Sequence, residues 1–271
     1  MELATENEGT PLVSVIIPTR NYAHYLPDAI ASVRKQTHPN IELIIVDDES
    51  TDNTAEIAKA LGVRYLYTKH VGPRNPSNAQ NVGIRQSRGD FIVCLAADDM
   101  LEPNYIEECL QKFKPNTGFV WTGRQEFGDS HLAQTPNLKS ATRKFLFPDP
   151  GGALGAMMVR RAAYQKVGLY DLTMKGGEDW DMAIRLKAAG YEGVPILKLL
   201  HVCRIHGQCV GDVSTLIKKY PQIKAYSFID RLTSRILNPS RVLRNIEYRI
   251  TVKQKLVGDK RYEKLPARMN E

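Results

Sequence analysis

Residues 41–52 read IELIIVDDESTD, an apolar run that ends in two carboxylates and passes into a helix-capping sequence. The run at 41–46 is rich in β-branched residues and predicts a buried strand. The hydroxyl and carboxylate groups of residues 50–52 suit a helix N-cap, and we expect that helix to extend to Leu61. A strand that leads directly into a helix is the unit from which parallel sheets are built.

The same alternation continues on both sides of this stretch. Toward the N-terminus, residues 13–18 predict a first strand that Pro18 ends, and residues 26–36 predict a helix. Toward the C-terminus, strands are predicted at 63–67, 91–95 and 120–122, and helices at 76–87 and 103–113. This order predicts an α/β fold with a Rossmann-like, mostly parallel central sheet flanked by helices, over roughly the first 120 residues.

Beyond residue 122 the pattern becomes less regular. Residues 128–152 are polar and rich in proline and predict a long loop, of the kind that often forms a lid or an acceptor site. Regular periodicity returns at 156–159 and 160–167, and a helix is predicted at 179–189, with Gly190 as its left-handed cap. From residue 214 onward the chain predicts two basic helices, at 214–237 and 240–256.

Composition indicates a globular protein that is large enough to bury a core without disulfides. The chain has 271 residues, of which 42% are hydrophobic and 25% charged, and its four cysteines fit reduced thiols in a cytosolic protein. The polar, acidic start is unlike a signal peptide. No apolar run reaches the roughly 18 residues of a membrane-spanning helix. We therefore expect a cytoplasmic protein that is not integral to a membrane.

The formal net charge of +7 is concentrated at the C-terminal end. From Val213 onward there are about 14 Lys or Arg against about 5 Asp or Glu. A solvated helical face is the simplest interpretation. Peripheral docking at the inner face of a membrane, on anionic lipid or a lipid-linked acceptor, is the second, because apolar residues alternate with the basic ones. Nucleic-acid binding is not expected, since no recognised module is present.

Acidic residues follow two of the predicted strands. Asp47 and Asp48 end one strand, and Asp98 and Asp99 follow another. The carboxyl ends of parallel strands border one crevice, where carboxylates repel each other unless a cation joins them. Mg²⁺ and Mn²⁺ bind carboxylates together with phosphate oxygens and water. Turns and helix caps are the alternative role for such acids, but two acidic strand ends favour an anionic ligand held through a metal.

Other phosphate-binding signatures are missing from the sequence. No Gly-x-Gly-x-x-Gly follows the first strand, and no Walker-type loop is present, which counts against a dinucleotide dehydrogenase and a P-loop phosphotransferase. A nucleotidyltransferase on a similar sheet stays open as an alternative. That class would place a loop rich in Gly, Arg or Lys after the first strand, and residues 18–21 (PTRN) match it poorly.

Five segments together resemble the successive motifs of the family 2 glycosyltransferases, which are inverting enzymes of the GT-A fold. The segments are SVIIPTRN at 14–21, VDDESTD at 46–52, NAQNVGI at 78–84, LAADD at 95–99 and GEDWD at 177–181. The resemblance runs from Val13 to His206 and implies a GT-A domain at 13–210. A flexible tail at 1–12 would precede this domain, and a basic helical extension at 211–271 would follow it.

The resemblance also implies roles for individual residues. Asp179 matches the catalytic base, and the metal would be held by Asp98 and His206. Contacts to the donor sugar or the acceptor are implied for Asp99, Glu178 and Trp180. The donor nucleotide is expected to contact Pro18, Thr19, Asn21, Asp48, Gln80, Asn81, Ala97 and Asp98, with Thr19 and Asp48 on the base and ribose.

Two positions depart from the family pattern. Ala96 replaces the first acid of the Asp-x-Asp motif, and Gln80 replaces the usual Arg of the Arg-Asn-x-Gly element. The loss of a carboxylate and of a phosphate-binding cation should weaken donor or metal binding. A catalytically weakened nucleotide-sugar-binding protein is therefore an alternative to an active enzyme.

The leading hypothesis is a glycosyltransferase that depends on Mn²⁺ or Mg²⁺ and inverts configuration. It would move a hexose-type sugar from a UDP or dTDP donor to the hydroxyl of a saccharide or lipid-linked acceptor, in polysaccharide or glycoconjugate synthesis. A displacement of this kind needs a base for the acceptor proton and a cation beside the departing diphosphate. Asp179, far along the chain, suits the separate base, although an acid there also suits a helix N-terminus.

A zinc site is disfavoured. His201, Cys203, His206 and Cys209 lie close together in the sequence, but their spacing is not a common zinc pattern, and along a strand the side chains would divide between two faces. Trp121 is expected in the core. Trp180 lies next to the presumed base and is expected in a wall or against the acceptor.

Overall fold

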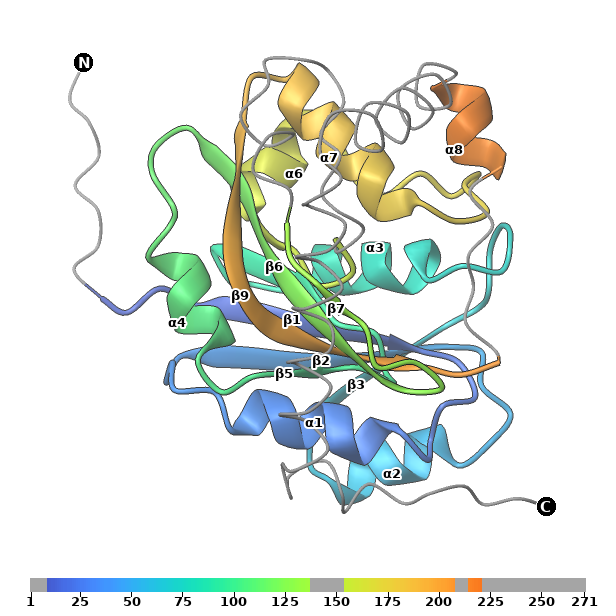
Figure 1. Cartoon of the computed structure of the whole chain (residues 1–271). Coiled ribbons are helices and arrows are strands. Elements are labelled where there is room, and N and C mark those ends of the chain that lie inside the picture. The colour runs from blue at the N-terminus through green and yellow to red at the C-terminus, as the bar shows by residue number, and fades with distance from the viewer. Residues whose placement is uncertain (1–8, 137–153, 208–213, 221–271) are drawn as a thin grey trace.

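A nine-stranded mixed sheet forms the centre of the protein (Figure 1). The computed structural model describes residues 9–136, 154–207 and 214–220. Along the sheet the strands follow the order β3 (Arg64–Thr68), β2 (Ile41–Asp48), β1 (Val13–Thr19), β4 (Phe91–Cys94), β8 (Met158–Arg160), β6 (Thr117–Gly128), β9 (Glu192–Ile205) and β5 (Met100–Leu101), while β7 (Ala133–Gln134) pairs with β6.

The first four strands in the chain form the parallel part of the sheet. β1 pairs in parallel with β2 and β4, and β2 pairs in parallel with β3. β8 is antiparallel to both of its neighbours, β4 and β6, and the long strand β9 runs parallel to β6. The prediction of an α/β fold with a mostly parallel sheet is confirmed, and the antiparallel β8 was not predicted.

Pro18 does not end the first strand, contrary to the expectation. It pairs with Val46, and β1 continues to Thr19. Successive residues of β1 direct their backbone N–H and C=O groups in turn toward β2 and toward β4. The carbonyl oxygen of Ile16 points to the β4 side, where it accepts the N–H of Leu95, the residue after β4. Pro18 therefore faces the β4 side, where the pairing has already ended at Ile16. The missing N–H of Pro18 leaves no gap in the sheet, which is why a proline is tolerated here.

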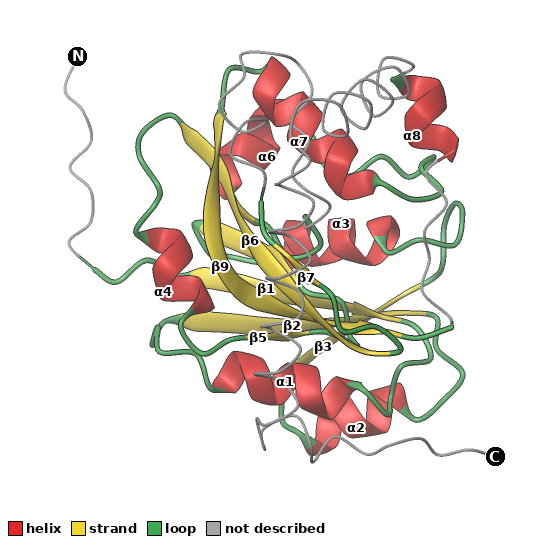
Figure 2. Ribbon diagram, in the orientation of Figure 1, coloured by secondary structure: helices red, strands yellow, loops and turns green. Residues whose placement is uncertain are grey.

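Helices cover both faces of the sheet (Figure 2). One face packs against α1 (Leu26–Arg34), α2 (Thr54–Ala60) and α4 (Tyr105–Leu110). The other packs against α3 (Ser77–Gln86), α6 (Arg161–Val167) and α7 (Glu178–Ala188), with α8 (Ser214–Lys219) beside α7. In β1, Val13, Val15 and Ile17 join the first apolar cluster and Ile16 joins the second, as expected for a strand buried on both faces.

Several boundaries differ from those predicted. The helix expected at 103–113 is shorter, and α2 begins at Thr54, although the carboxylate of Asp52 still accepts the Thr54 N–H at 3.1 Å. The strand expected at 120–122 extends over the twelve residues of β6. β9 was not predicted at all. The left-handed cap of α7 is confirmed, since Gly190 has a φ of +89°.

Some predictions fall outside the described residues. They concern most of the N-terminal tail, residues 137–152 of the expected loop, Cys209, and the basic helices beyond residue 220. The domain boundaries at 1–12, 13–210 and 211–271 therefore stay predictions. None of the helices in the described part of the chain combines the length and the apolar character that a membrane crossing requires.

Candidate active site

The candidate site begins where β1 and β2 end side by side. Thr19 pairs with Asp47, so Thr19 and Asp48 reach the same edge of the sheet. Both residues are buried. The Thr19 hydroxyl has no hydrogen-bond partner among the described residues, whereas buried hydroxyls normally have one. An open buried hydroxyl at a strand end is available to a ligand.

Hydrogen bonds join the loops after these two strands, and each loop contains one residue with a positive φ. Asn21 and Glu49 have φ values of 58° and 64°, a region that residues other than glycine seldom adopt. The Asn21 side-chain oxygen accepts the Thr51 N–H at 2.7 Å, and the Asn21 N–H donates to the Ser50 hydroxyl at 2.9 Å. Strained residues of this kind cluster at functional sites. Asn21, predicted to contact the donor, thus also fixes the rim.

Asp48 is held by two residues from the next elements of the chain. His70 Nδ1 contacts Asp48 Oδ2, and the Asn78 side-chain amide donates to Asp48 Oδ1 at 3.1 Å. Asn78 also donates to the Lys69 carbonyl oxygen at 2.8 Å. His70 was missed in the sequence, although it follows β3 just as Asp48 ends β2 and the same strand-edge argument applies to it.

The two predicted donor residues of α3 have different surroundings. The Asn81 side-chain amide donates to the Tyr170 carbonyl oxygen at 2.8 Å, and its oxygen accepts the Tyr170 N–H at 2.9 Å. Asn81 therefore ties α3 to the segment that precedes α7. Gln80 is also buried, but its side-chain oxygen has no partner among the described residues. Only Gln80 of this pair keeps a free polar atom for a ligand.

Asp98 and Asp99, in the turn after β4, meet residues of β9 and of the chain just after it. Asp98 Oδ2 lies 2.8 Å from His206 Nε2, and Asp99 Oδ2 lies 2.8 Å from His201 Nε2. The other Asp99 oxygen accepts the Arg204 N–H at 2.8 Å. Both oxygens of Asp99 are thus engaged by β9. Asp98 keeps one oxygen outside its contact with His206, and the structure brings together the two residues predicted to hold the metal.

The electrostatic environment of Asp98 disfavours an isolated carboxylate. Burial and the negative charge of Asp99 raise its pKa, and His206 opposes this shift. Ala97, predicted to lie near the donor, is buried beside Asp98 and offers only its backbone for polar contact. A cation next to Asp98 would offset the repulsion between the two acids.

Arg204 fixes the segment that carries His206. Its guanidinium donates to Asp28 Oδ2 at 3.1 Å and to the Asp98 carbonyl oxygen at 3.2 Å. It also lies over the rings of Tyr25 and Phe127, each at 4.5 Å. The ring of His206 lies 5.5 Å from the ring of Tyr25. These contacts hold the end of β9 against α1 and against the turn of Asp98.

Asp179 lies in the first turn of α7, after Gly177, whose φ of +75° is a left-handed conformation. Burial and the charge of Glu178 raise the pKa of Asp179 well above its usual value. The charge of Asp179 in turn helps to raise the pKa of Cys94, the last residue of β4, and of Tyr170. Because such effects weaken with distance, Asp179 lies near enough to Cys94 and Tyr170 for its charge to act on both.

The two neighbours of Asp179 in the sequence, Glu178 and Trp180, are both at least partly buried. Burial raises the pKa of Glu178. Trp180 is partly buried and packs against the apolar cluster beneath α7, so at least part of its ring acts as a wall. Trp121, as predicted, is fully buried in the core.

Part of the zinc argument does not hold in the structure. His201 and Cys203 lie on one face of β9, and their ligand atoms and a carboxylate oxygen of Asp99 are all within 4.8 Å of one another. His206 instead contacts Asp98. Burial and Asp99 raise the pKa of the Cys203 thiol, which favours its protonated form. His201 and Cys203 thus form a hydrogen-bonded support for Asp99.

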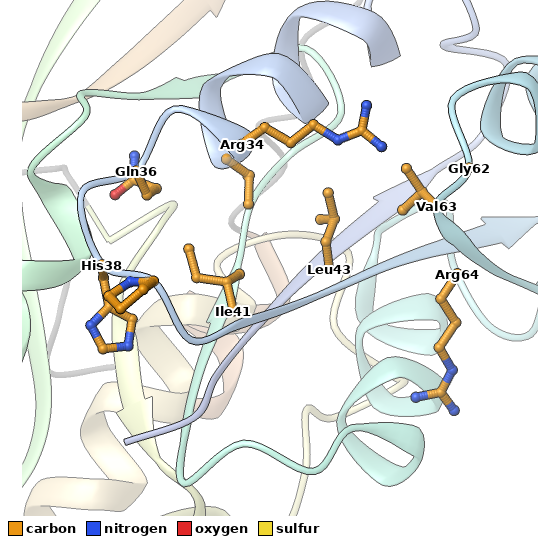
Figure 3. Close-up of a pocket in the computed structure, with 10 residues that line it drawn as sticks. Arg34, Gln36, His38, Ile41, Leu43, Gly62, Val63 and Arg64 are labelled. Carbon is orange, nitrogen blue, oxygen red and sulfur yellow. The ribbon is translucent and has the colours of Figure 1, made fainter. Parts of the chain in front are cut away.

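A separate pocket of about 450 Å³ opens at the amino ends of β2 and β3 (Figure 3). Arg34, His38, Ile41, Val63 and Arg64 are among its lining residues. Ile41 begins β2 and Asp48 ends it, so this pocket and the candidate site lie at opposite ends of the parallel strands. None of the predicted site residues lines the pocket.

Comparison with known proteins gives consistent matches. The family model described as glycosyl transferase family 2 matches residues 14–168. An uncharacterised glycosyltransferase of Rickettsia prowazekii is 33% identical over 245 residues, which cover 84% of this chain and 74% of that protein. One of Rickettsia typhi is 28% identical over the same shares of the two chains.

Two solved structures share the fold. S. aureus TarS 1-349, in complex with UDP-GlcNAc, has a TM-score of 0.58 and 18% identity, over 73% of this chain and 60% of that one. A mannosyltransferase from Pyrobaculum calidifontis, in complex with GDP-Man and Mn²⁺, has a TM-score of 0.57 and 17% identity, over 78% of this chain and 61% of that one. The chain thus spans about three fifths of each. The expected GT-A fold is confirmed.

Proposed function

Because the chain belongs to glycosyl transferase family 2, we propose that it is a metal-dependent, inverting glycosyltransferase, which moves a sugar from a nucleoside diphosphate to an acceptor hydroxyl. One observation carries the proposal. Burial and a neighbouring acid raise the pKa of both Asp98 and Asp179, but among the described residues only Asp98 has an imidazole, that of His206, which opposes the rise. The first suits a cation and the second suits a base.

Asp98 and His206 fit a divalent cation. A carboxylate oxygen and an imidazole nitrogen 2.8 Å apart are suitable ligands for Mn²⁺, and somewhat less so for Mg²⁺. The raised pKa of Asp98 indicates that this carboxylate lacks sufficient positive charge around it. When bound, the cation supplies charge that offsets the negative charge on the departing diphosphate.

In the proposal the donor nucleotide lies across the ends of β1 and β2. The open hydroxyl of Thr19 and the carboxylate of Asp48 contact the base and ribose, with Pro18 and Asn21 beside them. Gln80 turns its unpartnered oxygen toward the donor, and Asn81 and Ala97 shape the same wall. The UDP-GlcNAc bound to TarS supports a uridine or thymidine donor, and the GDP-Man of the mannosyltransferase makes guanosine the alternative.

The chemical step requires only one proton acceptor from the chain. Asp179 takes the proton of the acceptor hydroxyl, whose oxygen forms a bond to the anomeric carbon as the bond from that carbon to the diphosphate breaks. The diphosphate leaves with the electron pair, and the configuration inverts. Glu178 and Trp180, next to Asp179, contact the donor sugar or the acceptor. Asp99 contributes by orienting Asp98, because both of its oxygens bind β9.

The test combines a donor panel with one substitution. UDP-GlcNAc, UDP-glucose, dTDP-glucose and GDP-mannose are incubated with the protein and Mn²⁺, and release of the nucleoside diphosphate is measured. We expect turnover of at least one donor, and loss of that turnover on chelation. Asp179→Asn should lower kcat by about 10²–10⁴-fold and leave donor affinity nearly unchanged, because it removes the base but keeps the shape.

The matched control is Glu192→Gln, which alters an exposed acid at the start of β9 and should leave kcat unchanged. Unchanged turnover of Asp179→Asn would remove Asp179 from the mechanism. Donor binding without any turnover in the wild-type protein would favour the nucleotide-sugar-binding protein instead. A saccharide or lipid-linked acceptor, a role in polysaccharide or glycoconjugate synthesis, and cytoplasmic placement with membrane contact through the basic extension stay predictions.

A further inference from the structure

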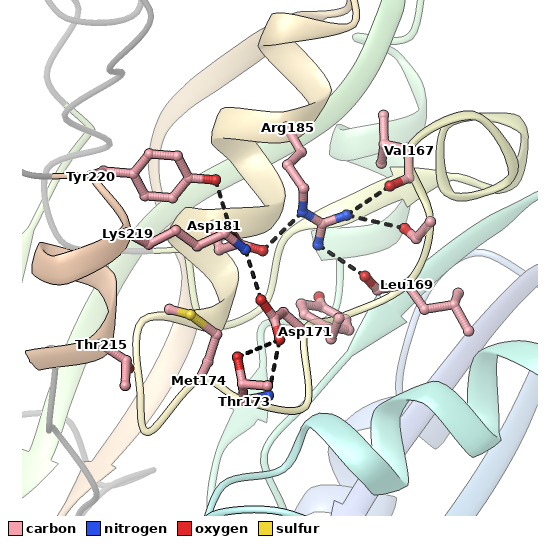
Figure 4. Close-up of polar contacts among 12 residues, drawn as sticks. Val167, Leu169, Asp171, Thr173, Met174, Asp181, Arg185, Thr215, Lys219 and Tyr220 are labelled. Atoms are coloured by element: carbon pink, nitrogen blue, oxygen red, sulfur yellow. Dashed lines mark hydrogen bonds and ion pairs between the residues drawn. The ribbon is translucent and has the colours of Figure 1, made fainter.

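A buried carboxylate lies on α7, two residues beyond Asp179. Asp181 is fully buried, and three side chains bind it (Figure 4). Arg185 Nε donates to Oδ2 at 2.8 Å, and the Tyr220 hydroxyl donates to Oδ1 at 2.9 Å. Lys219 Nζ lies 2.8 Å from Oδ1. A buried charge is tolerated only with such partners, so the position of Asp181 depends on them.

Lys219 makes a second contact, to the segment that leads into α7. Its Nζ lies 2.7 Å from Asp171 Oδ2, and this hydrogen bond is the main reason why the pKa of Asp171 falls to about 2. The Thr215 hydroxyl accepts the Lys175 N–H at 2.8 Å. Lys219 therefore bridges Asp171 and Asp181, and α8 contacts both the entrance and the first turn of α7.

Arg185 completes the connection from the other side of Asp181. Its guanidinium donates to the carbonyl oxygens of Val167 and Leu169, each at 2.9 Å. Residues 167–171 are thus bound through Arg185 at one end and through Asp171 at the other. Between them lies Tyr170, whose pKa is raised in part by the charge of Asp179. The contacts of Lys219, Asp181 and Arg185 thus join α8, α7 and the segment that contains Tyr170.

We propose that Lys219 and Tyr220 are positioning residues for the reaction. They hold the buried Asp181, and Asp181 fixes the first turn of α7, where Asp179 lies. The proposal rests on the proposed function of Asp179 as the base. Lys219 and Tyr220 bind Asp181 of α7 directly. The segment that they hold meets one predicted nucleotide residue, Asn81, through Tyr170. Their loss should therefore affect the chemical step more than donor binding.

The test uses neighbouring lysines of α8 in the full-length protein. Lys219→Met removes the bridging ammonium, and Lys218→Met removes an exposed ammonium one residue away. With the panel donor that gives the highest turnover, and with Mn²⁺, we expect Lys219→Met to lower kcat by about 10- to 100-fold, since a catalytic group displaced by about 1 Å has an effect of this size. The KM for the donor should stay near the wild-type value, and Lys218→Met should match the wild type in both constants.

Two further variants separate positioning from general stability. Lys219→Arg keeps a cation and should restore most of kcat. Tyr220→Phe removes a single hydroxyl and should lower kcat, with thermal unfolding confirming that each variant is folded at the assay temperature. This variant decides the question if Lys219→Met does not fold.

The outcomes distinguish the two proposals. If the wild-type protein turns over a donor and folded Lys219→Met and Tyr220→Phe have wild-type kcat, the positioning role is wrong and the proposed function stands. A rise in donor KM with unchanged kcat would also overturn it, because the network would then serve binding. If the wild-type protein turns over no donor, both proposals fail.

Discussion

Asp98 and Asp179 are two aspartates whose pKa values are raised, and they differ in whether a neighbouring group opposes the rise. Asp98 has an imidazole 2.8 Å from its carboxylate, which favours the charged form. Burial of Asp179 and the charge of the neighbouring Glu178 both favour its protonated form. A carboxyl group with a raised pKa is the stronger base once it has lost its proton.

The raised pKa of Asp179 predicts the acidic limb of the rate profile. The base works only when deprotonated, so kcat should fall as the pH drops through the pKa of Asp179. That limb should lie well above pH 4, near which an ordinary aspartate titrates. The measurement is kcat between pH 4.5 and about 9 at saturating donor and Mn²⁺.

Glu178→Gln provides the control for this profile. It removes the neighbouring negative charge that helps to raise the pKa of Asp179, so the limb should move to lower pH. A limb near pH 4, or one that Glu178→Gln leaves in place, would contradict the assignment. The second outcome would show that a group other than Asp179 sets the limb.

At the residue scale, the sequence predicted acids at strand ends more readily than their partners. Asp48 and Asp98 could be found because each follows an apolar run. His70 follows β3 and could have been found in the same way, whereas the contact of Asp28 with Arg204 depends on where β9 ends in space. Asp181 was taken as part of a motif, and nothing in its spacing indicates the contact with Lys219, which α8 brings back to α7.

At the scale of elements, the alternation of strands and helices predicted β1 to β4 and α1 to α3 well, because β1, β2 and β4 are short apolar runs that contain several β-branched residues. β9 was missed for a physical reason. Its pairing with β6 shifts register after Ile196, and the next residue, Leu197, is half exposed. This irregularity interrupts the period of two by which strands are found. β8, with three residues, is too short to give a pattern.

The close contact between α3 and β1 gives a prediction on stability. A Cβ atom added to Gly83 would lie 2.4 Å from Ile16 Cγ2, and Ile16 is fully buried. Alanine gains about 1 kcal/mol over glycine inside a helix, but overpacking costs about 1–3 kcal/mol and more in tight places. We expect Gly83→Ala to lower the free energy of unfolding by about 1–2 kcal/mol, measured by urea denaturation.

Gly9→Ala is the matched control, because a Cβ atom there meets nothing within 4 Å. In a double-mutant cycle, Ile16→Ala removes the atom that clashes, so the double variant should lose less stability than the sum of the two single variants. If Gly83→Ala were as stable as the wild-type protein, the helix and the strand would not be in the tight contact described.

At the scale of the whole molecule, the site joins elements from all parts of the described chain. The proposed donor residues come mainly from β1, β2 and α3, the proposed cation ligands from the turn after β4 and from the end of β9, and the proposed base from α7. Any ligand that contacts several of these elements at once should stabilise the fold.

We therefore predict that the donor raises the melting temperature only together with the metal. At a donor concentration of 100 times Kd the stabilisation is about 2.7 kcal/mol for a ligand that binds the folded state alone. The measurement is a thermal-shift scan of the same donor panel, with Mn²⁺ or with chelator. Asp98→Asn should abolish the dependence on Mn²⁺, and Glu192→Gln should keep it. An equal shift in Mn²⁺ and in chelator would contradict a cation at Asp98.

The late position of β9 has a consequence for synthesis of the protein. His201 and His206 meet acids that precede them by 102 and 108 residues. While the ribosome is still adding these residues, the nascent polypeptide already carries both aspartates but lacks the two imidazoles. On the proposed assignment of the cation to Asp98 and His206, the nascent polypeptide stays inactive until His206 has been added, and a messenger truncated before that point yields no active product.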